Sequence, residues 1–170
     1  SENSVCEGQV LSRPYSWKEA QIIVREMADS LALRLSCKGL VTDSLTLSVG
    51  YDRENCALGS YTGEVRTDHY GRQVPKSAHG TIRLETPSSL SSQMISGAVS
   101  LFGRIADPKL LIRRITITAN RVTKEPEFLQ LCLFTDQHRL EKEKHLQDAV
   151  LELKKRFGKN AVLKGTSFLD

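Results

Sequence analysis

The sequence predicts an α+β domain: a four-stranded, mainly antiparallel sheet with two helices on one face, in the order β-α-β-β-α-β. Two stretches, after positions 16 and 87, carry hydrophobic residues at helical spacing. Three others, at 44–51, 81–85 and 111–122, alternate apolar and polar residues, as strands with one buried face do. Because each element has a single apolar face, we expect the helices to cover one side of the sheet and leave the other side open.

The first strand and the first helix are expected within residues 4–39. Ser4–Leu11 reads weakly as a strand, and Pro14 is expected to end it. Ser16 and Glu19 then form a capping box, in which each side chain bonds to the backbone of the other residue. The apolar face of the helix that follows consists of Ala20, Val24, Met27, Leu31 and Leu35. Gly39 is expected to stop this helix.

The remaining elements of the domain follow in order. Ser44–Tyr51 is a strand, and Asp52–Gly80 is a polar excursion inside a hairpin, in which we expect local order because long structureless loops are uncommon. Thr81–Glu85 is the next strand, and a helix opens after Pro87. Its apolar face consists of Met94, Ala98, Leu101 and Ile105. Leu111–Val122 is the last strand.

Two regions are expected, residues 1–123 as the domain and residues 124–170 as a tail. The tail begins with a linker, Lys124–Glu127, and an apolar island, Phe128–Phe134. Asp136–Phe157 then reads as a third helix. Its narrow apolar stripe consists of Leu146, Ala149, Val150, Leu153 and Phe157. The stripe either docks on the domain or binds a partner, and the sequence leaves both open.

Composition indicates an ordinary soluble chain. The 170 residues are 39% hydrophobic and 26% charged, with a net charge of +4, which is compatible with a phosphate partner without demanding one. No run approaches the roughly 18 apolar residues that a membrane span needs. The four cysteines are Cys6, Cys37, Cys56 and Cys132. They form no CxxC pair, so we expect reduced thiols, a cytoplasmic protein and no membrane partner.

The open face of the predicted sheet carries small, hydroxylic or cationic side chains. Alternation places there Ser44, Thr46, Ser48, Thr81, Arg83, Arg114, Thr116, Thr118 and Asn120. Such a surface lets a phosphate backbone come close and offers it hydrogen-bond donors. Arg113 and Arg114 are consecutive, and consecutive side chains of a regular strand point to opposite faces, so the two cannot both lie on the open face. Arg114 is the one expected there. The face has no strand aromatic, so it does not fit an RNA-recognition motif that stacks bases.

The chain shows no catalytic motif. Its histidines have no partner at catalytic or metal-ligand spacing, and GxSxG, P-loop and HExxH patterns are absent. Paired carboxylates that could hold two Mg²⁺ ions are not evident either. We therefore expect this chain to have no enzyme activity of its own, no metal site and no cofactor.

Several segments resemble the C-terminal little finger domain of Y-family (UmuC/DinB-like) bacterial DNA polymerases. They are Lys38–Leu47, Thr67–Thr81, Leu101–Ile105 and Leu111–Ile115. The resemblance covers roughly Ser4–Val122 and continues less distinctly to Gly165. It implies translesion synthesis and DNA repair in the bacterial cytoplasm, as part of the SOS response, by a parent polymerase whose catalytic domain, with its Mg²⁺, lies outside this chain.

The resemblance also implies that the sheet lies along the major groove and holds primer-template DNA by its backbones. Arg113 and Arg114 match the paired arginines of the family's last strand, whereas Thr118 stands where some relatives carry a basic residue. Arg121 lies near the end of the same strand. The residues expected to contact DNA are Arg113, Arg114, Arg121, Arg83, Thr116, Thr118, Ser44, Thr46 and Lys76.

A second element lies in the tail, at 130–134. Gln130-Leu131-Cys132-Leu133-Phe134 resembles the peptide by which bacterial replication and repair proteins bind the sliding clamp. Gln130 would make polar contacts at the rim of a pocket, and Leu133 and Phe134 would fill an apolar groove, with Leu131 beside them. A short buried strand, or a segment that packs against the third helix, is the other reading of these residues.

Two further function classes stay open. The chain could be a stand-alone protein-interaction module that uses the sheet face or the third helix. It could also be an enzyme in its own right, which would require nucleotide incorporation by the purified chain, and we expect none. The chain is expected to be monomeric.

Overall fold

The computed structural model describes residues 3–57, 59–125 and 137–157 of the 170-residue chain. The elements are β1 (Val5–Tyr15), α1 (Trp17–Cys37), β2 (Leu40–Tyr51), α2 (Glu54–Ala57), β3 (Val65–Thr67), β4 (Gln73–Pro75), β5 (Ala78–Ser88), α3 (Ser91–Ile105), β6 (Ile112–Asn120), β7 (Thr123–Lys124) and α4 (Gln137–Phe157).

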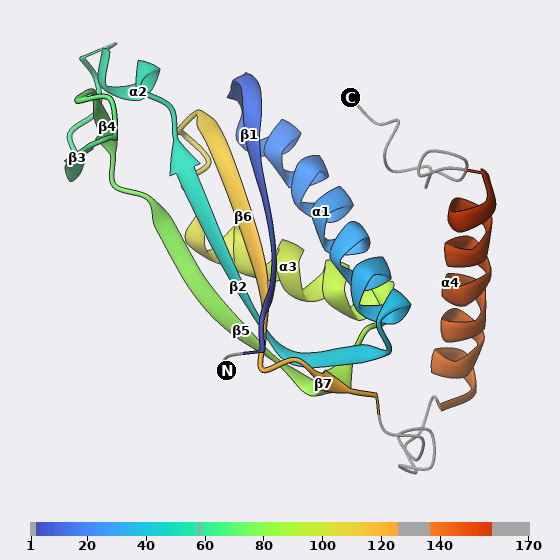
Figure 1. Cartoon of the computed structure of the whole chain (residues 1–170). Helices are drawn as coiled ribbons and strands as arrows, with labels where there is room; N and C mark the ends of the chain where they lie inside the picture. Colours follow the sequence, from blue (N-terminus) through green and yellow to red (C-terminus); the bar gives the residue numbers. More distant parts are fainter. Residues whose placement is uncertain (1–2, 58, 126–136, 158–170) are drawn as a thin grey trace.

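The main sheet has the strand order β1-β6-β2-β5, and every pair is antiparallel. The short β7 adds to the beginning of β2. Figure 1 shows α1 and α3 side by side on one face of this sheet, while none of the described helices lies on the other face. The predicted architecture, two helices on one face of an antiparallel sheet, is therefore confirmed.

The core forms between that helical layer and the inner face of the sheet. Alternate strand residues point into it, and both helices contribute their apolar faces. Its fully buried members include Leu45, Leu47, Val49, Ile115, Ile117, Val24, Leu31, Leu35, Met94, Leu101 and Phe102. The helix α3 comes close to the sheet at Gly97, where an added Cβ would lie 3.2 Å from Leu84 Cδ2. The inner face is thus filled, and within the described part of the chain the outer face of the sheet is not covered by a helix.

The N-terminus of α1 carries the predicted capping box. The backbone N–H of Glu19 donates to Ser16 Oγ (3.2 Å), and the N–H of Ser16 donates to Glu19 Oε1 (3.1 Å). A hydrogen bond from Arg13, reinforced by those from Ser16, lowers the pKa of Glu19 to about 2. Glu19 therefore stays ionised and keeps this cap well below neutral pH.

The strand β1 is longer than predicted. It runs through Pro14 to Tyr15, and its pairing with β6 is irregular between Val10 and Tyr15. Proline is tolerated there because β1 is an edge strand, where a missing N–H need not break the ladder. The expectation that Pro14 ends the strand is therefore wrong.

The excursion between β2 and β5 contains the local order that its length predicted. It holds the one-turn helix α2 and a hairpin of β3 and β4, in which Val65 pairs with Pro75 and Thr67 with Gln73. Figure 1 shows this hairpin beyond the end of the main sheet, next to α2. The excursion is thus a small structured projection from the domain.

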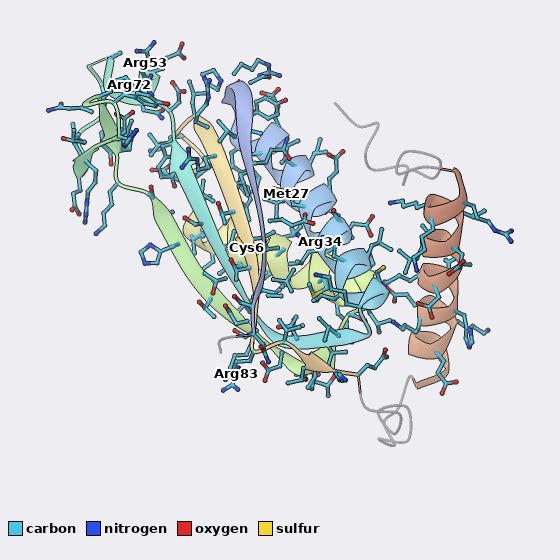
Figure 2. The ribbon with its side chains drawn as sticks, in the orientation of Figure 1. Cys6, Met27, Arg34, Arg53, Arg72 and Arg83 are labelled. Atoms are coloured by element: carbon cyan, nitrogen blue, oxygen red, sulfur yellow. The ribbon has the colours of Figure 1, made fainter. Side chains whose placement is uncertain are left out.

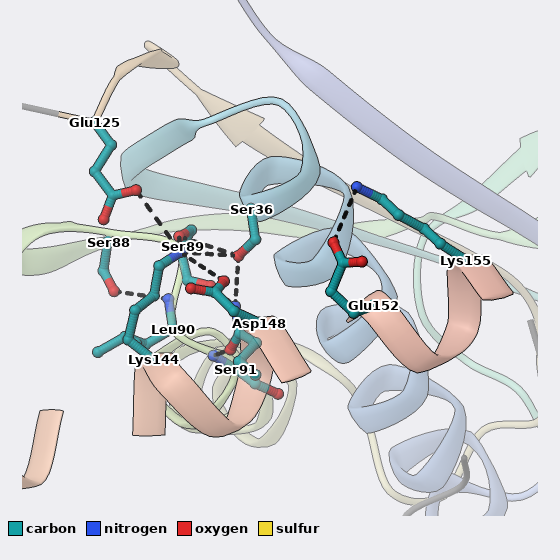
Figure 3. Close-up of polar contacts among 11 residues, drawn as sticks. Ser36, Ser88, Ser89, Leu90, Ser91, Glu125, Lys144, Asp148, Glu152 and Lys155 are labelled. Carbon is teal, nitrogen blue, oxygen red and sulfur yellow. Dashed lines mark hydrogen bonds and ion pairs between the residues drawn. The ribbon is translucent and has the colours of Figure 1, made fainter. Parts of the chain in front are cut away.

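The helix α4 contacts the domain through polar side chains (Figure 3). Gln147 is buried, with 5% of its surface exposed. Its Oε1 accepts from the N–H of Ser91 (2.5 Å), and its Nε2 donates to Ser36 Oγ (2.6 Å) and to the carbonyl of Ser89 (2.7 Å). One turn earlier, Glu143 accepts from the N–H (2.7 Å) and hydroxyl (2.5 Å) of Ser92.

These contacts complete the N-terminus of α3. The first N–H groups of a helix have no acceptor within the helix, and the N-cap residue Leu90 has no side chain that could accept from them. Gln147 and Glu143 supply the acceptors from α4 instead. A cap that is normally local is therefore provided by residues more than fifty positions away.

The apolar stripe of α4 does not lie in this contact. Leu146 is 67% exposed and Leu153 is 42% exposed. The alternative in which the stripe docks on the domain is therefore wrong for these two leucines, because the polar side of the helix occupies the docking position. Binding of a partner by the stripe stays a prediction.

Candidate nucleic-acid interface

The outer face of the sheet is a grid of small side chains. Strand register aligns them in rows across β1, β6, β2 and β5. One row is Cys6, Thr118, Thr46 and Thr81; the next is Gly8, Thr116, Ser48 and His79; an end row contains Val10, Arg114 and Gly50. We call these three rows the outer grid. The alternation that predicted Thr46, Thr116 and Thr118 on this face is confirmed.

A further row, Asn120, Ser44 and Arg83, lies at the other end of the face, and hydrogen bonds join it to the neighbouring row of the grid. Asn120 Nδ2 donates to Ser44 Oγ (3.1 Å) and to Thr46 Oγ1 (2.9 Å), and the hydroxyls of Thr46 and Thr81 lie 2.9 Å apart. Ser44 is only 4% exposed. Contrary to expectation, Ser44 therefore cannot offer its hydroxyl directly to DNA, because its neighbours in the sheet cover it.

Arg114 is the cation of the outer grid. Its side chain is exposed, and no ion pair joins it to another described residue. Two glycines flank it on this face. A Cβ at Gly50 would lie 3.3 Å from Arg114 Cβ, and a Cβ at Gly8 would lie 3.5 Å from Thr116 Oγ1. The missing side chains leave Arg114 and Thr116 open to a large ligand.

Arg113 lies at a break in the ladder. Gly50 pairs with Arg114 and Tyr51 with Ile112, so Arg113 has no partner residue on β2. Its guanidinium forms an ion pair with the buried carboxylate of Asp52 (3.4 Å). The alternation that separates Arg113 from Arg114 holds only in a regular strand, and this bulge interrupts it, so alternation does not fix the side on which Arg113 lies. Arg113 instead holds the beginning of the excursion against β6.

Arg83 and Arg121 share one carboxylate. Asp43 lies 3.6 Å from Arg83 and 2.9 Å from Arg121. Arg121 has a left-handed backbone (φ 49°), which turns the chain after β6 and brings its side chain to Asp43. Both expected DNA contacts therefore lie at the edge of the face with part of their charge balanced.

Lys76 lies apart from the grid, in the residues that follow β4. It forms an ion pair with Glu64 (3.2 Å), and a hydrogen bond from Lys76 holds the pKa of Glu64 below its ordinary value. Figure 2 shows Arg72 at this hairpin end and Arg83 at the opposite end of the sheet. The expected basic residues are thus spread over both ends of the face.

The contribution of β1 to this face was not predicted from the sequence. Cys6, Gly8 and Val10 complete the outer grid, but the alternation of this strand was hidden by Glu7 on its inner side. Glu7 is compensated there by Arg34 of α1 (3.1 Å). His79, opposite Ser48, was also missed. The signal that could have revealed the alternation of β1 was the pairing of Glu7 with Arg34, which explains a carboxylate on the inner side of the strand.

The predicted clamp-binding residues Gln130, Leu131, Leu133 and Phe134 lie outside the described residues. Among the residues that are described, no three His, Cys, Asp or Glu side chains gather as metal ligands would. None of the described helices is both long and apolar enough to cross a bilayer.

A family model matches residues 2–133, most of the chain: the impB/mucB/samB family C-terminal domain. The chain belongs to this family. The match confirms the resemblance to the little finger domain of Y-family DNA polymerases. It spans the sheet, α1 and α3, and it ends before α4.

Comparison with solved structures shows several that are similar to this chain. A solved structure described as a complex of the beta-clamp processivity factor and the little finger domain of PolIV has a TM-score of 0.45 and 12% sequence identity, covering 74% of this chain and 94% of that one. This similarity is too distant to bear on the function of the present domain. No curated protein matches the chain.

Proposed function

We propose that this little finger domain binds the backbones of primer-template DNA through the outer grid of its sheet. The observation that carries the proposal is the composition of the grid around Arg114. Its rows hold glycines, hydroxyls, a thiol, a histidine, one valine (Val10) and an exposed arginine, and they contain no Asp or Glu. Small donors beside an unpaired cation suit a phosphate backbone, which must approach closely.

Recognition of this kind tolerates any sequence. The grid has no aromatic ring apart from His79, and its single arginine cannot read several base pairs. Binding would therefore come mainly from phosphate contacts and release of counterions. A polymerase that must hold whatever template it is copying needs affinity of this kind.

The proposal extends to the parent polymerase. The segment at 130–134 would tether it to the sliding clamp, which raises the effective concentration of the enzyme at the primer end. Chemistry, with its Mg²⁺, would belong to catalytic domains and not to this domain. A protein-interaction module is the second candidate, favoured by the exposed leucines of α4, Leu146 and Leu153.

Titration of a labelled duplex with the purified chain at increasing salt tests the proposal. We expect binding at low salt whose logarithm falls linearly with the logarithm of salt concentration, with a slope of about −0.9 for each phosphate contact. Two duplexes of unrelated sequence should behave alike. A chain that binds only protein partners would show no affinity for either duplex.

A further inference from the structure

The tip of the β3–β4 hairpin presents an exposed aromatic ring. Tyr70 is 77% exposed, more than any other large hydrophobic side chain in the described part of the chain. The others, such as Val10 and Leu146, are aliphatic. A tyrosine held this far into solvent buries little of its ring in the fold, so folding stability does not explain its position.

The turn that carries this ring is firmly built. Asp68 accepts from the N–H groups of Tyr70 (2.9 Å) and Arg72 (2.8 Å), and also from Arg72 Nε (2.9 Å). Its own N–H donates to the carbonyl of Arg72 (2.8 Å), and Gly71 takes the positive φ (77°) that the turn requires. Burial raises the pKa of Asp68, but these hydrogen bonds outweigh it and hold the pKa below its ordinary value.

The side chains around Tyr70 leave part of its ring free. The guanidinium of Arg72 lies over the ring, 4.9 Å from its centroid. The rings of His69 and Tyr70 are nearly perpendicular (77°), with their centroids 5.4 Å apart. Arg72 thus backs the ring, while 77% of the surface of Tyr70 remains exposed.

The hairpin lies at the Arg114 end of the outer grid. The residues after β4 lead directly into β5, whose first residue Ala78 pairs with Val49, next to Gly50 in the end row. Figure 1 shows the hairpin projecting beyond that end of the sheet. DNA that lies on the grid and continues past Arg114 would therefore run toward the hairpin.

We propose that Tyr70, backed by Arg72, stacks on an unpaired nucleobase next to the duplex held by the outer grid. This inference rests on the proposed DNA binding. It assigns the duplex backbone to the outer grid and the unpaired base to the β3–β4 hairpin. The grid takes phosphates, and its one ring is that of His79, whereas the hairpin offers a tyrosine ring backed by a cation. Bases inside a duplex have both faces covered by their neighbours, so the ligand of Tyr70 is a base in a single-stranded extension.

The test compares a blunt duplex with the same duplex carrying a single-stranded extension. The wild-type chain should bind the extended form more tightly, and Tyr70→Ala should remove that advantage, a loss of about fivefold or more given the usual worth of a base–aromatic stack. Tyr70→Phe keeps the ring and should keep the advantage. Tyr70→Leu keeps apolar bulk without a π-face and should lose it.

A direct readout uses the full chain with Tyr70→Trp. Its fluorescence should be quenched by the extended duplex and not by the blunt one. Equal affinity of wild type and Tyr70→Ala for the extended duplex would overturn the hairpin proposal alone, provided that blunt-duplex binding still depends on Arg114. Failure of the wild type to bind either duplex would overturn both this inference and the proposed function.

Discussion

Replacing Arg114 by Glu should weaken duplex binding by about tenfold at low salt, because the change removes one phosphate contact and places a negative charge beside the backbone. The position of Arg114 explains why we expect so large an effect. It lies in the outer grid between Val10 and Gly50, and no described carboxylate neutralises it. The slope of affinity against salt should also become shallower by about one unit.

A matched control separates local contact from total charge. Lys18→Glu makes the same change in net charge on the helical side, at an exposed position in the first turn of α1. That variant should bind duplex almost as the wild type does. If Lys18→Glu and Arg114→Glu lose affinity for the duplex equally, binding depends only on the net charge of the chain and the outer grid is not the interface.

Arg113→Ala should act differently from a change at Arg114. Its guanidinium is engaged with Asp52, whose carboxylate also accepts from the N–H of Glu54. Arg113→Ala should therefore destabilise the beginning of the excursion, at Asp52 and Glu54, more than it weakens DNA binding by the outer grid. The paired arginines that the family resemblance treated alike are thus distinguished by one ion pair.

The double change Leu133→Ala and Phe134→Ala should abolish capture of the chain by the sliding clamp. Two apolar side chains that fill a groove dominate the affinity of a short peptide, so their removal leaves little to hold it. A pull-down with purified clamp measures the effect. DNA binding by the same variant should be unchanged, because the outer grid is untouched.

Phe128→Ala with Leu129→Ala is the matched control for this peptide. It removes the same two residue types from the positions just before the motif. Clamp capture should survive it. Loss of capture in both variants would indicate a general apolar contact, and retention in both would remove the clamp assignment.

Much of the fold was predictable from local pattern. Leu45, Leu47 and Val49 alternate with polar residues, and the register shows all three in the core. The capping box of Ser16 and Glu19 was equally readable, because its partners lie three residues apart. Such features depend on neighbours in the sequence, which is why a single sequence reveals them.

Other features depend on tertiary contacts that no local pattern encodes. Asp43 reaches Arg121 only because β2 and β6 are neighbours in the sheet. The cap that Gln147 gives to Ser91 joins residues far apart in the chain. The burial of Ser44 has the same origin. Sequence could therefore place the open face correctly and still misjudge which of its side chains are accessible.

If DNA lies on the outer grid, a duplex titration should change the backbone amide chemical shifts of the sheet. Shifts should concentrate on Thr46, Thr116 and Thr118, while core helix residues such as Ala28 and Ala98 stay unchanged. Shifts confined to α1 and α3, with the sheet unchanged, would show that DNA does not bind the outer grid.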